Sequence, residues 1–151
     1  MKSFLIDCLD YLSCLTLSIN VSNAMSHSVF IVDDDESICR ALKILLMTYG
    51  FAVKAFNSAQ SFFDAVPNDE QGCLILDIRM PVLDGWATHK IISDSGSTRP
   101  VIFISAEEQT DGVERALKVG AVGFLQKPVD GEVLVKLIKM INESMGVSLT
   151  N

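Results

Sequence analysis

The chain has 151 residues, a length typical of one domain and too short for two domains with separate cores. Hydrophobic residues make up 49% and charged residues 21%, the proportions of an ordinary globular protein. The formal net charge of -7 argues against binding to nucleic acid or to an anionic membrane surface by this domain. Four cysteines without a C-x-x-C pair, and only two histidines, predict neither a zinc site nor a disulfide framework.

The first 24 residues differ in composition from the rest. Residues 4–19 are mainly apolar but contain two aspartates, and the run is shorter than the roughly 20 residues that span a bilayer. The same carboxylates count against a secretory signal peptide. Ser22-Asn23-Ala24 resembles the remnant of a cleaved purification tag, so we expect Met25 to be the natural first residue. Residues 1–24 would then be either vector-derived or mistranslated upstream sequence, and the sequence does not decide between these two origins.

From Met25 onward, short apolar runs alternate with segments of helical periodicity. The clearest helix places Ile38, Leu42 and Leu46 on one stripe and ends at Gly50. Branched and aromatic residues predict five strands, which cover 29–32, 51–56, 73–76, 101–104 and 122–125. Periodicity predicts five helices, which cover 36–48, 58–66, 85–94, 109–118 and 130–143. This alternation, with right-handed crossovers, predicts a doubly wound α/β fold whose parallel sheet is covered on both faces.

Polar residues follow four of the predicted strands. They are Asp33 and Asp34 after the first, Asp77 after the third, Ser105 after the fourth and Lys127 after the fifth. Because the carboxyl ends of parallel strands meet at one edge of the sheet, we expect these side chains to lie close together. Three carboxylates repel one another unless some are protonated or a divalent cation neutralises them, and hard oxygen ligands suit Mg²⁺ or Mn²⁺. The sequence therefore predicts a magnesium site at this edge.

The charges at this edge also favour binding of phosphate. Three carboxylates, one lysine and one Mg²⁺ sum to about zero, so an incoming phosphoryl group would meet a metal, an ammonium group and a hydroxyl donor together. Asp77 is the best candidate nucleophile, because it stands alone at the centre of the edge, whereas the pair Asp33-Asp34 is better placed to hold the cation. A carboxylate that attacks phosphorus forms an acyl phosphate.

Several motifs combine these residues with their neighbours. They are Val32-Asp33-Asp34-Asp35, the run from Leu76 to Gly85, Ile104-Ser105-Ala106, and Gly120-Ala121 followed by Phe124 and Lys127-Pro128. Together they resemble the receiver domain of bacterial two-component response regulators, most closely the receivers of nitrogen-fixation-type regulators. The similarity covers residues 28 to about 143. It implies a flavodoxin-like five-stranded fold with strand order 2-1-3-4-5, a receiver domain over 25–145 and a tail over 146–151.

The resemblance implies a role for each residue at the sheet edge. Asp77 would accept a phosphoryl group from a histidine of a sensor histidine kinase or phosphotransfer protein. Asp34 would bind Mg²⁺ directly, Asp33 largely through water, and the backbone carbonyl of Arg79 would supply a further oxygen. Lys127 would pair with Asp77 and then with the phosphoryl oxygens. The domain would be a phosphoacceptor signalling domain of the cytoplasm and not an enzyme in the usual sense.

The loops around the acids have mainly structural roles in this family. The resemblance implies that the peptide between Lys127 and Pro128 is cis, which aims the lysine inward. Pro81 would fix the loop after the third strand, and Asp84 would cap the helix that begins at Gly85.

A second group of residues would transmit and time the signal. Ser105 would donate a hydrogen bond to the phosphoryl group and leave a space into which Phe124 turns. Ala106 is small and would leave the phosphoryl group accessible. The resemblance implies that Arg79 and Glu107 tune dephosphorylation, and a contact between them would shield the acyl phosphate from water.

Partner surfaces follow from the same resemblance. The face built from 109–118, 122–125 and 130–143 would rearrange on phosphorylation, and a homodimer through this face is possible. The helix over 36–48 would be the kinase-docking side. Few residues follow position 143, too few for a DNA-binding unit, so we expect either a stand-alone receiver or a piece of a longer regulator.

Two alternative functions stay open. A phosphatase of the haloacid-dehalogenase type would use Asp33 and Asp35 of a D-x-D-x-[ST] pattern, with Ser105 and Lys127 as phosphate ligands. That family needs a further acid pair after the lysine, where Asp130 stands alone. The other alternative is a pseudo-receiver, a binding module with the same fold that is not phosphorylated.

Overall fold

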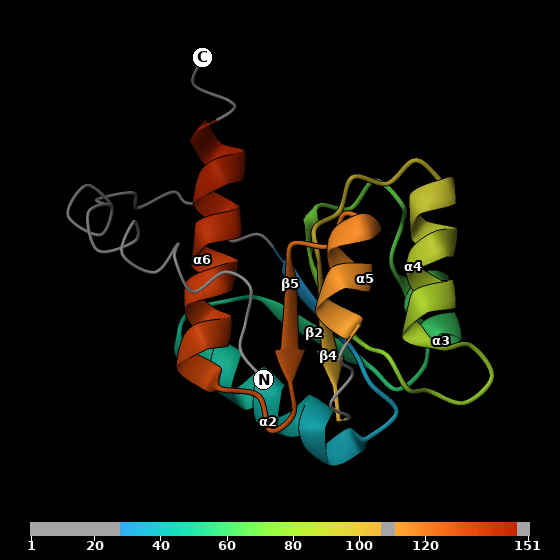
Figure 1. The fold of residues 1–151 in the computed structure, drawn as a ribbon. Helices are drawn as coiled ribbons and strands as arrows, with labels where there is room; N and C mark the ends of the chain where they lie inside the picture. The colour runs from blue at the N-terminus through green and yellow to red at the C-terminus, as the bar shows by residue number, and fades with distance from the viewer. Residues whose placement is uncertain (1–27, 107–110, 148–151) are drawn as a thin grey trace.

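The computed structural model describes residues 28–106 and 111–147, with five strands and five helices that alternate along the chain (Figure 1). The strands are β1 (Ser28–Val32), β2 (Val53–Phe56), β3 (Gly72–Asp77), β4 (Val101–Ser105) and β5 (Gly123–Gln126). The helices are α2 (Glu36–Thr48), α3 (Ala59–Ala65), α4 (Gly85–Asp94), α5 (Gly112–Lys118) and α6 (Gly131–Val147). The predicted leader over residues 1–24 and the end of the predicted tail, from residue 148, lie outside the described residues.

The strands form one parallel sheet in the order β2-β1-β3-β4-β5. The central strand β3 pairs with β1 on one side and with β4 on the other, and all six of its residues are buried. Strand order reverses between β1 and β3, so the carboxyl ends of these two strands flank the crevice in which such sheets place their ligands. The predicted fold class and strand order are confirmed.

Side chains that alternate along each strand divide the core into two layers. Val29 and Ile31 belong to the layer covered by α2 and α6, whereas Phe30 and Val32 belong to the layer covered by α3, α4 and α5. The two groups of helices lie on opposite faces of the sheet (Figure 1). Burial on both faces explains why the strands are continuous apolar runs in the sequence.

Some boundaries differ from the predictions for identifiable reasons. Strand β2 begins at Val53 and not at residue 51, because the amide of Phe51 still donates to the carbonyl of Leu46 and so closes the end of α2. The first two residues of the helix predicted over 109–118 lie outside the described residues, and the described helix α5 begins at Gly112, after its N-terminal cap Asp111. Helix α6 ends at Val147, four residues beyond the predicted end, and β5 lies one residue further along.

None of the helices within the described residues is long and apolar enough to cross a membrane.

Candidate functional site

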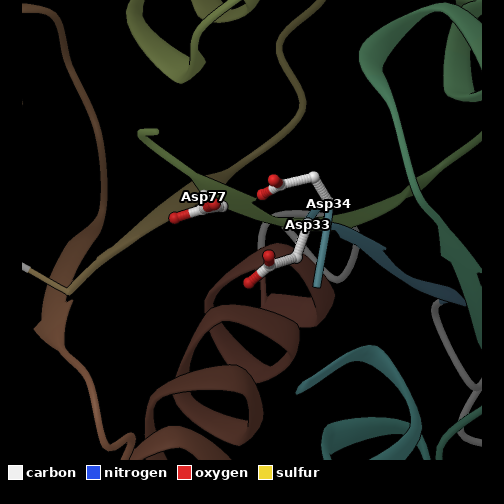
Figure 2. Close-up of side chains that lie close together, drawn as sticks. All are labelled: Asp33, Asp34 and Asp77. Atoms are coloured by element: carbon white, nitrogen blue, oxygen red, sulfur yellow. The ribbon is translucent and has the colours of Figure 1, made fainter. Parts of the chain in front are cut away.

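Three carboxylates converge at the carboxyl ends of β1 and β3 (Figure 2). Asp33 and Asp34 follow β1, and Asp77 is the last residue of β3. One oxygen from each carboxylate lies within 4.8 Å of the other two. Asp33 and Asp77 are buried, whereas Asp34 is exposed, so the cluster is open to solvent on the side of Asp34.

Lys127 lies against this cluster and contacts two of the acids. Its Nζ atom is 2.9 Å from Oδ2 of Asp33 and 3.2 Å from Oδ1 of Asp77. The Lys127 side chain is 14% exposed. Pairing with Asp77 was expected from the sequence, but the shorter contact to Asp33 was not. One cation therefore bridges the ends of β1 and β3.

The backbone around Lys127 fixes its position. The amide of Lys127 donates to the carbonyl of Ser105 over 2.7 Å, which ties the residue after β5 to the last residue of β4. The Lys127-Pro128 peptide bond is cis. Ser105 is itself buried, with 1% of its surface exposed. The serine and the lysine thus lie at the same sheet edge as the three acids.

The electrostatics of the cluster depend on burial and on like charge. Burial, with repulsion from Asp33, raises the pKa of Asp77 to about 7, although Lys127 acts in the opposite direction. Burial alone would lower the pKa of Lys127, but hydrogen bonds and attraction from both acids outweigh it and raise the pKa. The lysine is therefore charged at neutral pH, and its single positive charge does not balance the negative charge of the three acids.

The donor set fits a hard divalent cation. Three carboxylate oxygens lie together, and oxygen ligands of this kind suit such a cation. Oδ1 of Asp33 accepts a hydrogen bond from the amide of Asp35 over 2.9 Å, and its Oδ2 is paired with Lys127. Asp34 and Asp77 are left as the carboxylates best able to contact a cation directly.

The loop after β3 is fixed by helix capping and by close packing. The carboxylate of Asp84 accepts a hydrogen bond from the amide of Ala87 over 2.8 Å, which caps α4. The amide of Gly85 donates to the carbonyl of Ile78, also over 2.8 Å. A Cβ atom on Gly85 would clash with the backbone carbonyl of Asp77. The start of α4 therefore packs directly against the backbone of the central acid.

The remaining predicted residues lie around the cluster in different environments. Phe124 on β5 is 1% exposed and packs in the layer below α3, α4 and α5. Ala106 and Arg79 are exposed, and Arg79 has an interaction within the structure. Glu107 lies outside the described residues.

Two features of this region were missed by sequence reasoning. Val82 has a left-handed backbone with φ of 70°, which is unusual for a branched residue, and its side chain is fully exposed. Trp86 packs on Phe103 of β4, with ring centroids 4.4 Å apart, and the guanidinium of Arg115 lies 4.2 Å from the Trp86 ring centroid. No sequence pattern signals either feature.

Comparison with known proteins identifies the family. Residues 29–139 match the response regulator receiver domain. The response regulator protein TmoT of Ectopseudomonas mendocina is 37% identical over 117 residues, which are 78% of this chain and 53% of that protein. The transcriptional regulatory protein FixJ of Bradyrhizobium diazoefficiens is 35% identical over 111 residues, 74% of this chain and 54% of that protein. The chain spans about half the length of these curated relatives.

Solved structures agree with this comparison. The crystal structure of FixJ-N has a TM-score of 0.71 and 33% sequence identity, and the match covers 78% of this chain and 94% of that chain. The response regulator StyR has a TM-score of 0.72 and 32% identity, over 82% of this chain and 64% of that chain. The predicted similarity to nitrogen-fixation-type regulators is confirmed by the two FixJ matches. The chain therefore belongs to the receiver domain family of two-component response regulators.

Proposed function

We propose that this signalling domain accepts a phosphoryl group on Asp77 from a phosphohistidine of a sensor histidine kinase or phosphotransfer protein in the cytoplasm. The observation that carries the proposal is the convergence of Asp33, Asp34 and Asp77 within 4.8 Å, with Lys127 in contact with two of them. A receiver needs a nucleophilic carboxylate, a cation site and a fixed ammonium group at one place, and the acid cluster and Lys127 at this edge of the sheet would supply them.

Asp34 and Asp77 would hold Mg²⁺ or Mn²⁺ directly, with the backbone carbonyl of Arg79 as a further ligand. Asp33 would contribute mainly through water, because one of its oxygens already accepts an amide hydrogen bond and the other is paired with Lys127. The bound cation would neutralise the acids and draw charge from the phosphoryl oxygens. It would also lower the pKa of Asp77, which burial and Asp33 raise.

Phosphoryl transfer then needs little movement within the domain. A carboxylate oxygen of Asp77 attacks phosphorus, the phosphorus–nitrogen bond to the donor histidine breaks, and the leaving imidazole takes up a proton. Lys127 lies 3.2 Å from the acceptor carboxylate, where its ammonium group stabilises charge that develops on the phosphoryl oxygens. The hydroxyl of Ser105 donates to the same group. Pro81, Asp84 and Gly85 hold the loop that positions Asp77.

The signal would leave the site through Ser105 and Phe124. The hydrogen bond from Ser105 to the phosphoryl group draws the end of β4 inward, and the buried position of Phe124 is the one that phosphorylation favours. Helix α5, β5 and α6 would present the altered face, on which a homodimer forms. Helix α2, beside the acid pair, would dock the kinase. Gel filtration with and without beryllofluoride and Mg²⁺ tests the dimer, since an unchanged elution volume would exclude it.

The lifetime of the phosphorylated state would be set by three residues. Ala106 leaves the phosphoryl group accessible to water, and a contact between Arg79 and Glu107 shields it. An unchanged dephosphorylation rate in Arg79→Ala would rule out the shielding contact.

The alternative phosphatase function gains no support from the geometry. Its second acid, Asp35, is the N-terminal cap of α2 and accepts hydrogen bonds from the amides of Ser37 and Ile38. Asp130 is likewise a helix cap, because its carboxylate accepts from two amides at the start of α6. The acid cluster with its lysine also argues against a pseudo-receiver, which would have no use for a nucleophile and a cation site.

Incubation with acetyl phosphate, followed by intact mass measurement, tests the proposal. We expect one added phosphoryl group on the wild-type chain with Mg²⁺ and none with EDTA. Asp77→Asn should abolish the modification, whereas the control Asp94→Asn, at an exposed position on α4, should not alter it. Modification of Asp77→Asn, or its loss only in Asp33→Asn, would contradict the proposal and favour the phosphatase.

A further inference from the structure

A stack of three side chains connects β4, α4 and α5. The ring of Phe103, which is fully buried on β4, lies 4.4 Å from the ring of Trp86 on α4, with a tilt of 44°. The guanidinium of Arg115 on α5 covers Trp86, with 4.2 Å between the central carbon and the ring centroid. This distance is well within the range of cation–π attraction. Two helices that share one face of the sheet are thus joined through a cation and one aromatic ring, and this ring packs on a second ring from the sheet.

The inner end of the stack adjoins the residues that would carry the switch. Phe103 pairs in register with Phe124 on β5, and it lies two positions before Ser105 on the same strand. Residues two apart on a strand point to the same face, so Phe103 and Ser105 share a face of the sheet. Phe103, Phe124 and Ala116 of α5 also belong to the same buried layer. The layer that holds Phe124 thus also holds a residue of α5, so a shift of α5 would disturb the packing of this layer.

Helix α5 has little buried surface, since Gly112 and Ala116 are its buried residues. The helix has seven residues, and within the described residues its cap, Asp111, makes no capping hydrogen bond through its side chain. Leu117 is 54% exposed, so one apolar side chain of the helix does not pack inward. Arg115 and Trp86 also border an open cavity of about 520 Å³, whose other lining residues are Ile78, Arg79, Met80, Pro81 and Asp84. The stack thus links α4 and α5 at this open region, beside the apolar layer to which Ile92 of α4 and Ala116 of α5 also belong.

We propose that Arg115 and Trp86 are positioning residues, which hold α5 in the arrangement that buries Phe124 and thereby strengthen binding of a phosphoryl group at Asp77. The inference rests on the proposed function, in which phosphorylation favours the buried position of Phe124. The stack and the buried Phe124 occur together in this structure. A contact that stabilises one arrangement raises the affinity of any ligand that prefers this arrangement.

The test measures the dissociation constant of beryllofluoride, a phosphoryl analogue, by calorimetry on the full chain with saturating Mg²⁺. Arg115→Met keeps the aliphatic packing but removes the cation. We expect two- to fivefold weaker binding, the factor that corresponds to about 0.5–1 kcal/mol of cation–π attraction. Arg115→Lys keeps a cation and should restore most of the affinity. Lys118→Met is the matched control, because it removes an exposed cation of the same helix that pairs with Glu114 over 3.2 Å.

Three further measurements separate the possible outcomes. The affinity for Mg²⁺ alone should be equal in all variants, since the stack does not touch the acids. Trp86 is the single tryptophan, so its emission should change in Arg115→Met and report loss of the stack. Should Arg115→Met not fold, Trp86→Phe, with a smaller ring, should weaken beryllofluoride binding in the same direction.

Failure of the proposed function and failure of this inference give different results. A wild-type chain that does not bind beryllofluoride would overturn the proposed function. Binding to the wild type with equal or tighter binding to Arg115→Met would overturn the inference alone. Equal weakening in Arg115→Met and Lys118→Met would also overturn it, because the effect would then follow the net charge of α5 and not the stack.

Discussion

Replacement of Asp77 by asparagine tests the electrostatics of the acid cluster in the metal-free protein. Burial and repulsion from Asp33 raise the pKa of Asp77 from 3.8 to about 7. Between pH 3.8 and pH 7 the native protein holds a proton on Asp77 that the unfolded chain has released. The folded protein is therefore most stable, as far as Asp77 is concerned, below pH 3.8. This contribution to the unfolding free energy is lost as the pH rises through 7.

The magnitude follows from the difference between the two pKa values. They differ by about 3, and one pKa unit corresponds to about 1.4 kcal/mol, so ionisation of Asp77 removes at most about 4 kcal/mol of unfolding free energy. About 2–3 kcal/mol of this loss falls between roughly pH 5 and pH 8. Asparagine resembles the protonated acid and does not ionise. We expect Asp77→Asn to be more stable than the wild type at pH 8, by about 2–4 kcal/mol.

Urea unfolding in EDTA, measured from pH 5 to pH 8 for both proteins, provides the assay. Burial lowers the pKa of His89, which gives a pH dependence of the opposite sign, but this histidine is present in both proteins and cancels in the difference. A difference between variant and wild type that stays constant across this window, or a wild type that is the more stable at pH 8, would refute the reasoning.

Three further substitutions test the packing around the site by urea unfolding. Lys127→Met leaves two buried carboxylates without their cation and should lower the unfolding free energy by about 3 kcal/mol at pH 7. An unchanged unfolding free energy would show that the ion pair does not stabilise the fold. Gly85→Ala should lower the unfolding free energy by about 1–3 kcal/mol, because the new Cβ meets the carbonyl of Asp77. The control Gly131→Ala should lower it less, because its Cβ meets the end of a flexible side chain. Equal losses in the two variants would contradict the close approach at Gly85. Val82→Asn should stabilise the protein by about 1 kcal/mol, since asparagine tolerates a left-handed backbone, and a loss of stability would show that the valine is not strained.

The position of the acid cluster could be predicted because it follows from topology. Apolar runs fixed the strands, and parallel connections place every strand's carboxyl end at one edge of the sheet. Asp33, Asp34 and Asp77 therefore had to converge, and the structure places one oxygen of each within 4.8 Å of the others. The apolar stripe before Gly50 predicted α2 for a similar reason, because a helix that buries one face has apolar residues at helical spacing.

Contacts between distant side chains could not be predicted in this way. Lys127 was expected beside Asp77, but its shorter contact is to Asp33, and the choice depends on fractions of an ångström in the packing of β1 against β3. The stack of Trp86 on Phe103 joins residues that are separated by a helix and a loop, and neither hydrophobic period nor charge spacing reports such a contact.

The backbone of Val82 shows a different limit of sequence reasoning. Local preference would place glycine or asparagine at a left-handed position, not a branched residue. The loop is nevertheless held at its end by the cap of Asp84 on α4 and by the hydrogen bond from Gly85 to Ile78. Tertiary constraints on both sides of a short loop thus override the preference of one residue within it.

The chemical identity of the modified residue tests the account most directly. After incubation of the wild-type chain with acetyl phosphate and Mg²⁺, borohydride reduces an aspartyl phosphate to homoserine, which peptide mass mapping locates. The account predicts homoserine at position 77 alone, and none when EDTA replaces Mg²⁺. Homoserine at position 33, or an unmodified chain in the presence of the metal, would contradict it.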